Sequence, residues 1–244
     1  MKVKIHDTTY IFLLISFLSG YFEYMYLFLL IIFVHESGHY FFSKLIHFKY
    51  SSITLYPFGG ITIYNEDLNI STNKELFVLF GGIVFQLLFY LLIVVLFNNG
   101  CITSHVFNII KRINIILISF NFMPIIPLDG GKLMNILLDK VLSYKISNMV
   151  SIIISILFSL YFVLFHTSLF KILLFIYLIK CIYFELCNSN LKYNRFILER
   201  YLNNYKFKRI KIIKNINYLR RDFKHIINNQ FENDYLHKLF DRKE

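Results

Sequence analysis

Cysteine, proline and acidic residues are scarce in this chain, and the shortages narrow the classes of protein to consider. The 244 residues include 3 Cys, 3 Pro and 15 Asp plus Glu, against 26 Lys plus Arg. Three cysteines without a CxxC spacing argue against a disulfide framework or a zinc knuckle, so we expect ordinary small apolar residues. No nucleic-acid-binding motif accompanies the basic excess, so we expect no nucleic-acid partner.

Hydrophobic residues are abundant in this chain, whereas charged residues are few. They make up 57% of the chain, with a mean hydropathy of +0.55, whereas a soluble domain is about 45–50% apolar. The positive charge is concentrated in residues 190–244, which hold 14 Lys plus Arg and 6 Asp plus Glu. A basic tail beside apolar segments is typical of the cytoplasmic face of a membrane protein.

The apolar runs predict an all-α polytopic membrane protein with about six transmembrane helices, a small β-hairpin after the second span and a short α/β cytoplasmic tail. The first run is not followed by a small-residue cleavage site, which favours a spanning helix over a signal peptide. With six spans, both termini are cytoplasmic and most Lys and Arg lie inside. The expected spans are residues 5–20, 22–46, 75–97, 105–127, 146–165 and 169–186.

Two domains are expected, a transmembrane domain at 1–189 and a basic cytoplasmic tail domain at 190–244. In the tail, KRIKII predicts a strand and INYLRRDFKHII an amphipathic helix. Residues 51–64, SSITLYPFGGITIY, predict the hairpin. Because this segment is unusually apolar for a cytoplasmic loop, we expect it to fold back over a functional site, although an ordinary surface hairpin is the alternative.

The stretch HESGH fits the pattern HExxH inside the second expected span. Residues four apart share a helix face, so His35 and His39 can reach one ion while Glu36 stands beside it. Ionisable residues at membrane depth are costly and mark function. A cluster that snorkels to water from a helix end is the alternative.

A third metal ligand is needed because catalytic zinc normally has three protein ligands. The candidate is Asp129, after Asn121, Pro124 and Pro127 at the end of the fourth span, where the prolines interrupt the helix. The turn DGG can aim its carboxylate towards the bundle, and this end lies on the same side as the histidines. A helix cap or a solvated turn is the alternative role for Asp129.

Two features of the third span bear on the same region. Gly81 and Gly82 would let another backbone approach closely. Gln86, one turn further on, is placed to hydrogen-bond a ligand or substrate, and an ordinary polar contact between helices is an equal alternative.

HESGH, YPFGG and NFMPIIPLDGGK together resemble the site-2 protease family of intramembrane zinc metalloproteases, and nearly the whole chain is similar to its sporulation branch. The resemblance implies hydrolysis of a peptide bond within or near the membrane, with one Zn²⁺ per chain. It implies the metal ligands His35, His39 and Asp129, the catalytic base Glu36, and a substrate region shaped by Asn121, Pro124, Pro127, Phe58 and Gly59.

The same resemblance suggests the partners. It implies a membrane-associated substrate similar to the sigma-factor precursor pro-sigma-K, and inhibitory membrane proteins that hold the enzyme inactive. Two other classes are weighed against the protease, a membrane zinc transporter and a catalytically silent metal-binding membrane protein. The polar groups gather at one depth rather than along a path, and a purely structural site has no need of Glu36.

Overall fold

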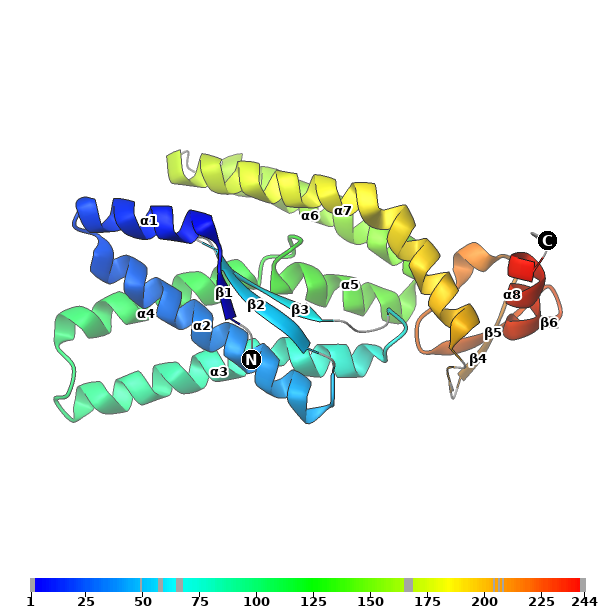
Figure 1. Cartoon of the computed structure of the whole chain (residues 1–244), viewed down its shortest axis with the longest axis horizontal. Coiled ribbons are helices and arrows are strands. Elements are labelled where there is room, and N and C mark those ends of the chain that lie inside the picture. The colour runs from blue at the N-terminus through cyan, green and yellow to red at the C-terminus, as the bar shows by residue number, and fades with distance from the viewer. Residues whose placement is uncertain are drawn as a thin grey trace. The chain divides into compact units, whose positions relative to one another are not determined.

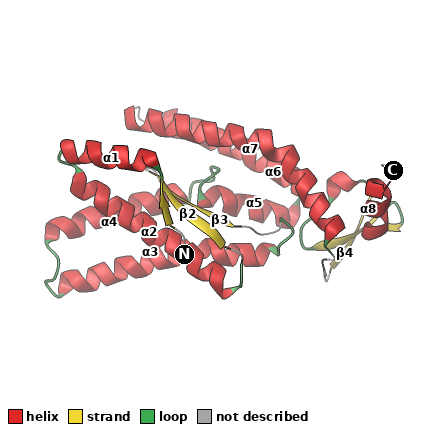
Figure 2. Ribbon diagram, in the orientation of Figure 1, coloured by secondary structure: helices red, strands yellow, loops and turns green. Residues whose placement is uncertain are grey.

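The computed structural model describes residues 3–48, 50–56, 59–64, 68–164, 169–203, 205, 207 and 209–241. The described chain is mostly helical, with two small sheets (Figures 1 and 2). The helices are α1 (Asp7–Leu18), α2 (Phe22–Leu45), α3 (Thr72–Asn98), α4 (Ser104–Asn121), α5 (Asp129–Val141), α6 (Tyr144–Leu164), α7 (Leu169–Leu202) and α8 (Glu232–Phe240), with a 3₁₀ turn at Ile216–Tyr218. The strands are β1 (Val3–Ile5), β2 (Tyr50–Tyr56), β3 (Gly59–Tyr64), β4 (Arg209–Ile213), β5 (Phe223–Ile227) and β6 (Gln230–Phe231).

Four of the described helices are long and apolar enough to cross a membrane, namely α2, α3, α6 and most of α7. The six expected spans are therefore not all confirmed. Helix α1 has 12 residues, about 18 Å at 1.5 Å per residue, which is short of a hydrocarbon core of about 30 Å. Helix α4 is interrupted after Asn121 and carries Lys111 and Arg112, so it does not qualify either.

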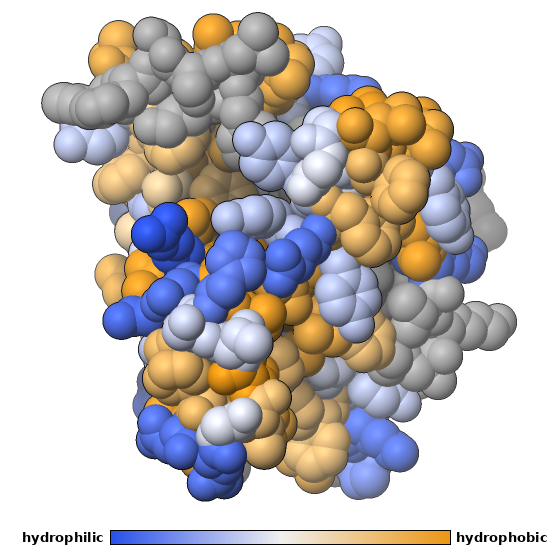
Figure 3. Space-filling model, turned by 90° about the vertical axis from the view of Figure 1, so that its left-hand side faces the viewer, coloured by the Kyte–Doolittle hydropathy of each residue, from blue (hydrophilic) through white to orange (hydrophobic). Residues whose placement is uncertain are grey.

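Large hydrophobic side chains are exposed over much of the helical surface, as the face in Figure 3 illustrates. Leu18 is 77% exposed and Leu164 79% exposed. In water, apolar exposure on this scale would favour aggregation. A surface that faces lipid tails is apolar without this cost. The exposure therefore agrees with the four apolar helices in indicating a membrane protein.

The chain divides into two compact units, and the first comprises residues 1–66 and 76–121. In it α2 packs against α4 around a core of Leu27, Ile31, Ile32, Ile93, Ile109, Ile110 and Leu117. Strand β1 pairs parallel with β2, and β2 pairs antiparallel with β3. Both β2 and β3 contact α2, so this small sheet lies against the helix that carries HESGH.

The second unit comprises residues 67–75 and 122–244. Helix α6 packs between α5 and α7, and α7 continues to Leu202, well beyond the end expected near residue 186. A small three-stranded sheet follows, in which β4 pairs parallel with β5 and β5 antiparallel with β6. Helix α8 packs on β5 and α7, and Phe196, Leu219, Ile227 and Leu236 form a core beneath it.

The tail corrects one prediction. The strand expected in KRIKII is present as β4, but INYLRRDFKHII is not an amphipathic helix. It forms a short 3₁₀ turn and then strand β5, separated by Asp222, whose φ of +58° no α-helix can accommodate. Asn228 and Asn229 also have positive φ and connect β5 to β6, as in a two-residue hairpin turn.

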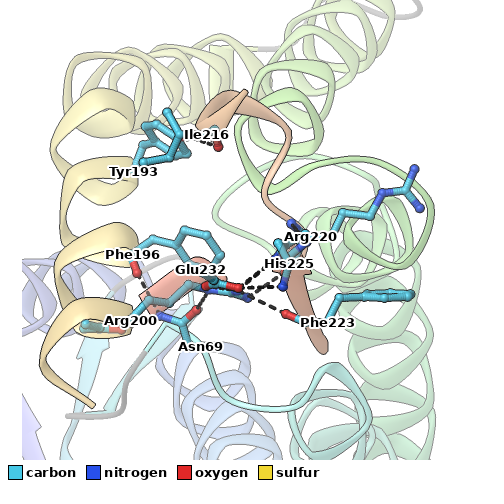
Figure 4. A network of polar contacts seen from close by, with 10 residues as sticks. Asn69, Tyr193, Phe196, Arg200, Ile216, Arg220, Phe223, His225 and Glu232 are labelled. Carbon is cyan, nitrogen blue, oxygen red and sulfur yellow. Dashed lines mark hydrogen bonds and ion pairs between the residues drawn. The ribbon is translucent and has the colours of Figure 1, made fainter. Parts of the chain in front are cut away.

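A buried arginine joins the end of α7 to this tail sheet (Figure 4). The side chain of Arg200 is 1% exposed and donates to Oε1 of Glu232 at 2.8 Å. It also donates to the backbone oxygens of Phe223 and Arg220 and to the side-chain oxygen of Asn69. The end of α7 and the tail sheet are therefore joined by a buried ion pair between Arg200 and Glu232.

Candidate metal centre

Helix α2 places three potential metal ligands at one buried point. His35, Glu36 and His39 are 4%, 7% and 4% exposed, and one potential ligand atom from each lies within 4.8 Å of the others. The spacing of four residues brings the two imidazoles onto adjacent turns of one face. The cluster expected from HExxH is therefore assembled within α2.

The two imidazole rings are oriented by hydrogen bonds to their Nδ1 atoms. Nδ1 of His39 lies 3.0 Å from the backbone oxygen of Val78, and Nδ1 of His35 lies 3.0 Å from Oε1 of Gln86. A carbonyl oxygen only accepts, so Nδ1 of His39 carries the proton. Nε2 of Gln86 donates to Oδ1 of Asn114 at 2.7 Å, which turns its Oε1 towards His35. Both Nδ1 atoms are thus donors.

With the Nδ1 protons engaged, the Nε2 atoms present lone pairs, and these two atoms lie 3.1 Å apart. Two nitrogens bound to one tetrahedral zinc ion, each at about 2.0–2.1 Å, lie about 3.3 Å apart. Histidines that bind zinc usually donate their other nitrogen to a carbonyl or another acceptor, which is the arrangement here. The residues present therefore fit two of the ligands of a zinc ion.

Glycines bring the neighbouring backbone up to this cluster. A Cβ atom on Gly38 would overlap with the backbone of Gly81, so these glycines allow α2 and α3 to touch. A Cβ atom on Gly82 would lie 2.5 Å from Nε2 of His39, and one on Gly60 of β3 would overlap with Cγ of Glu36. The close approach expected at Gly81 and Gly82 is therefore present, and strand β3 reaches the glutamate.

Asp129 is the first residue of α5, in the second unit, and is 9% exposed. Nζ of Lys132 lies 3.1 Å from its Oδ1. A Cβ atom on Gly130 or Gly131 would overlap with the backbone of residues 122–126, so these glycines allow the turn to pack closely. The turn thus has the tight form expected of DGG, and the role of Asp129 as third zinc ligand stays a prediction.

The residues expected to shape the substrate region have different surroundings. Nδ2 of Asn121 lies 3.5 Å from Nε2 of His35, beside the cluster. Pro124 and Pro127 lie in the non-helical segment between α4 and α5, where Oγ of Ser155 accepts from the backbone N–H of Ile126. Gly59 begins β3, and Phe58 lies outside the described residues. Contact of these residues with a substrate stays a prediction.

Two residues that orient the histidines were missed by sequence reasoning. Val78 acts through its carbonyl oxygen, which every residue possesses, so no side-chain pattern marks it. Asn114 is 3% exposed, and a buried amide in an apolar helix is a recognisable polar signal. For Gln86 both alternatives hold, since it bonds a candidate ligand and forms a contact between helices.

The buried HExxH cluster and the four apolar helices define a membrane protein with a candidate metal site. The model of Peptidase family M50 matches residues 23–100 and 97–165, more than half of the chain. The chain therefore belongs to Peptidase family M50, the site-2 protease family.

Curated relatives and a solved structure agree with this family. The chain is 28% identical over 145 residues to "Stage IV sporulation protein FB" of Bacillus subtilis, covering 59% of this chain and 50% of that protein. It is 27% identical over 157 residues to "Zinc metalloprotease MJ0392" of Methanocaldococcus jannaschii, covering 59% and 44%. The chain thus spans about half the length of these relatives.

The structure of "Site-2 Protease from Methanocaldococcus jannaschii" matches with a TM-score of 0.61 and 21% identity, covering 75% of this chain and 89% of that one. At this identity the match shows a shared fold. The likeness extends over most of the chain, and the recognition of the site-2 protease family from its motifs is confirmed.

Proposed function

We propose that this chain is an intramembrane zinc metalloprotease that hydrolyses a peptide bond in a membrane-associated protein. The observation that carries the proposal is the convergence of two Nε2 atoms at 3.1 Å, with both Nδ1 atoms held by acceptors, beside a buried glutamate. His35 and His39 would hold one zinc ion per chain with Asp129 as the third ligand. The family and the relative named a zinc metalloprotease support this assignment.

A zinc ion held by these residues would supply Lewis-acid chemistry, which would polarise the scissile carbonyl and lower the pKa of a water molecule. Glu36 accepts the proton of the attacking water and passes it to the leaving amine as the C–N bond breaks. Gln86 and the Val78 carbonyl keep both imidazoles in the ligating orientation. The substrate would be extended, because a helix hides its carbonyls. It would pass the region of Asn121, Pro124, Pro127, Phe58 and Gly59.

For the substrate we propose a sporulation sigma-factor precursor similar to pro-sigma-K, with membrane proteins that hold the enzyme inactive. The support is the similarity to a protein named for stage IV of sporulation. We further propose that both termini and the active site lie on the cytoplasmic side. The 14 Lys plus Arg of residues 190–244 support that orientation.

Co-expression of the chain with a pro-sigma-K-like precursor tests the proposal, with Glu36→Gln as the matched variant. Loss of a general base costs about 10²–10⁴-fold, so the variant should leave the precursor uncut within the time that the wild type needs to complete cleavage. Zinc content, measured on purified protein, should be equal in the two. Cleavage by Glu36→Gln at the wild-type rate would refute the role of Glu36. Zinc uptake into proteoliposomes would instead favour a transporter.

A further inference from the structure

The second unit contains a cavity of about 690 Å³ that has no part in the proposed mechanism. One wall is residues 69–74, which lead into the first turn of α3, and another is formed by six residues of the tail, namely Tyr205, Phe207, Arg209, Arg221, Asp222 and Phe223. Lys140, at the end of α5, contributes from a third side. Tyr205, Phe207 and Phe223 give the cavity an aromatic wall.

Positive charge dominates the lining. Lys74, Lys140, Arg209 and Arg221 line the cavity, against one carboxylate, that of Asp222. This carboxylate is already engaged, because its Oδ2 accepts from Oγ1 of Thr72 at 2.6 Å and from the Thr72 backbone N–H at 3.1 Å. It thus occupies the anion position at the start of α3.

The four cations differ in how they are compensated. Arg221 pairs with Glu75 at 2.6 Å and with Asp139 at 3.2 Å. Nζ of Lys140 donates to the neutral amide of Asn73 at 2.8 Å. Among the residues that the structure describes, no carboxylate pairs with Lys74, Lys140 or Arg209. Within the described part of the chain, three cations that line one cavity thus have no carboxylate partner.

Arg221 gives a second reason to expect a bound acceptor. Its side chain is 6% exposed, and its Nε–H has no hydrogen-bond partner within the described parts of the chain. A buried N–H that meets neither protein nor water is costly, so such groups are rare in native proteins. An acceptor inside the cavity that Arg221 lines would remove this cost.

We propose that this cavity binds a phosphate group, carried by a soluble phosphate compound or by an anionic lipid headgroup. Lysines supply point charges and arginine a planar fork, the combination that proteins use for phosphate oxygens. The cavity lies at the start of α3, because Thr72 lines it, and it is also lined by Tyr205, three residues after the end of α7 at Leu202. That position gives access both to headgroups and to solutes.

The test uses the full chain purified in a neutral detergent and compares two double variants. Lys140→Gln with Arg209→Gln removes two uncompensated cations of the cavity. Lys214→Gln with Lys238→Gln removes the same charge from exposed positions outside its lining. Inorganic phosphate is titrated against chloride of equal ionic strength, and the apparent dissociation constant is read from the shift in Tm. A parallel arm compares nanodiscs of phosphatidylcholine with nanodiscs that also contain phosphatidic acid.

We expect phosphate, phosphatidic acid or both to raise Tm in the wild type and in the control variant. The cavity variant should bind about tenfold more weakly or worse, because each lost cation removes a charge-assisted hydrogen bond. A response to phosphate identifies a soluble ligand, and a response to phosphatidic acid alone identifies a headgroup. No shift in either arm, or equal shifts in the two double variants, would overturn the proposal.

Discussion

Two buried polar clusters in this chain are built on opposite principles. In the first unit, His35 and His39 turn their Nε2 atoms towards each other at 3.1 Å, with Glu36 beside them. In the second unit, Arg200 is paired with Glu232 at 2.8 Å, and His225 completes the cluster. The first directs lone pairs and a carboxylate to a common point, whereas the second balances its own charge. A bound cation would complete the first.

The hydrogen-bond partners of the ring nitrogens also differ between the two clusters. Nδ1 of His35 meets Oε1 of Gln86 and Nδ1 of His39 meets the carbonyl oxygen of Val78, so the Nε2 atoms are the ones that would bind a metal in the proposed site. Around His225 both nitrogens are used by the protein, since Nδ1 meets Glu232 and Nε2 accepts from the backbone N–H of Arg220. His225 is thus bonded within the protein through both ring nitrogens, as expected of a structural histidine.

The largest expected effect is loss of zinc on removal of one imidazole. His39→Ala deletes a proposed metal ligand, so we expect zinc affinity to fall by more than about 100-fold, beyond the usual effect of a residue that only supports a ligand. Precursor cleavage should be lost with it. Zinc content after dialysis, measured by mass spectrometry, checks this. His105→Ala, whose side chain is 67% exposed, is the matched control, and equal zinc loss in both variants would contradict the site.

The second effect should appear in stability. Arg200→Met leaves Glu232 as a buried charge without its partner, so we expect a loss of about 3–5 kcal/mol in the free energy of unfolding. Denaturant unfolding of the purified chain measures it. Arg195→Met is the control, because that side chain is 60% exposed and its ion pair with Glu199 contributes about 1 kcal/mol or less. Similar losses of unfolding free energy in both variants would mean that the buried pair of Arg200 and Glu232 does not stabilise the tail more than an exposed ion pair does.

The third effect is a partial loss of zinc affinity on removal of Gln86, which orients the proposed ligand His35. Gln86→Leu removes the acceptor from Nδ1 of His35, which should weaken zinc binding by about 10–100-fold without abolishing it. Gln86→Glu keeps an acceptor in place and should bind more tightly than the Leu variant. Competition with a chromophoric chelator measures both. Wild-type affinity in Gln86→Leu would show that the ring is fixed in another way.

The sequence predicts the histidine cluster well and its surroundings poorly, for a physical reason. The four-residue spacing of His35 and His39 fixes their shared face within α2, so the cluster depends on a single element. The carbonyl of Val78 and the amide of Asn114 come from other helices, and their position depends on how closely α3 and α4 approach. Asp129 shows the limit, because its α5 lies in the other unit and its ligand role rests on motif resemblance.

In the tail, local turn signals indicate the observed structure better than the helical spacing of apolar residues does. The apolar residues of INYLRRDFKHII recur at helical spacing, which favoured a helix. Yet Phe223–Ile227 is a strand whose side chains alternate in burial at its end, and Asn228 and Asn229 adopt the positive φ of a hairpin turn. The Asn-Asn pair is a turn signal that outweighs a few apolar residues at helical spacing.

The smallest expected effect is a pH dependence that belongs to the self-balanced cluster. Burial lowers the pKa of His225 below its ordinary value of 6.5, although Glu232 opposes the shift. The folded state therefore prefers the neutral ring, and between the lowered pKa and 6.5 the unfolded chain binds more protons. Stability contributed by neutral His225 is thus full above pH 6.5 and declines as the pH falls.

His225→Gln isolates this contribution, because glutamine can still donate to Glu232 and accept from Arg220 but does not titrate. Asp139 works in the other direction, since burial raises its pKa to about 6 and protonation there favours the fold as the pH falls. Subtracting the variant from the wild type cancels Asp139. The wild type should lose more stability than His225→Gln as the pH falls from about 7 to 5.5, measured by denaturant unfolding. Parallel pH profiles would mean that folding leaves the pKa of His225 unchanged, and a wild type that gains stability relative to the variant as the pH falls would mean that the fold holds the ring charged.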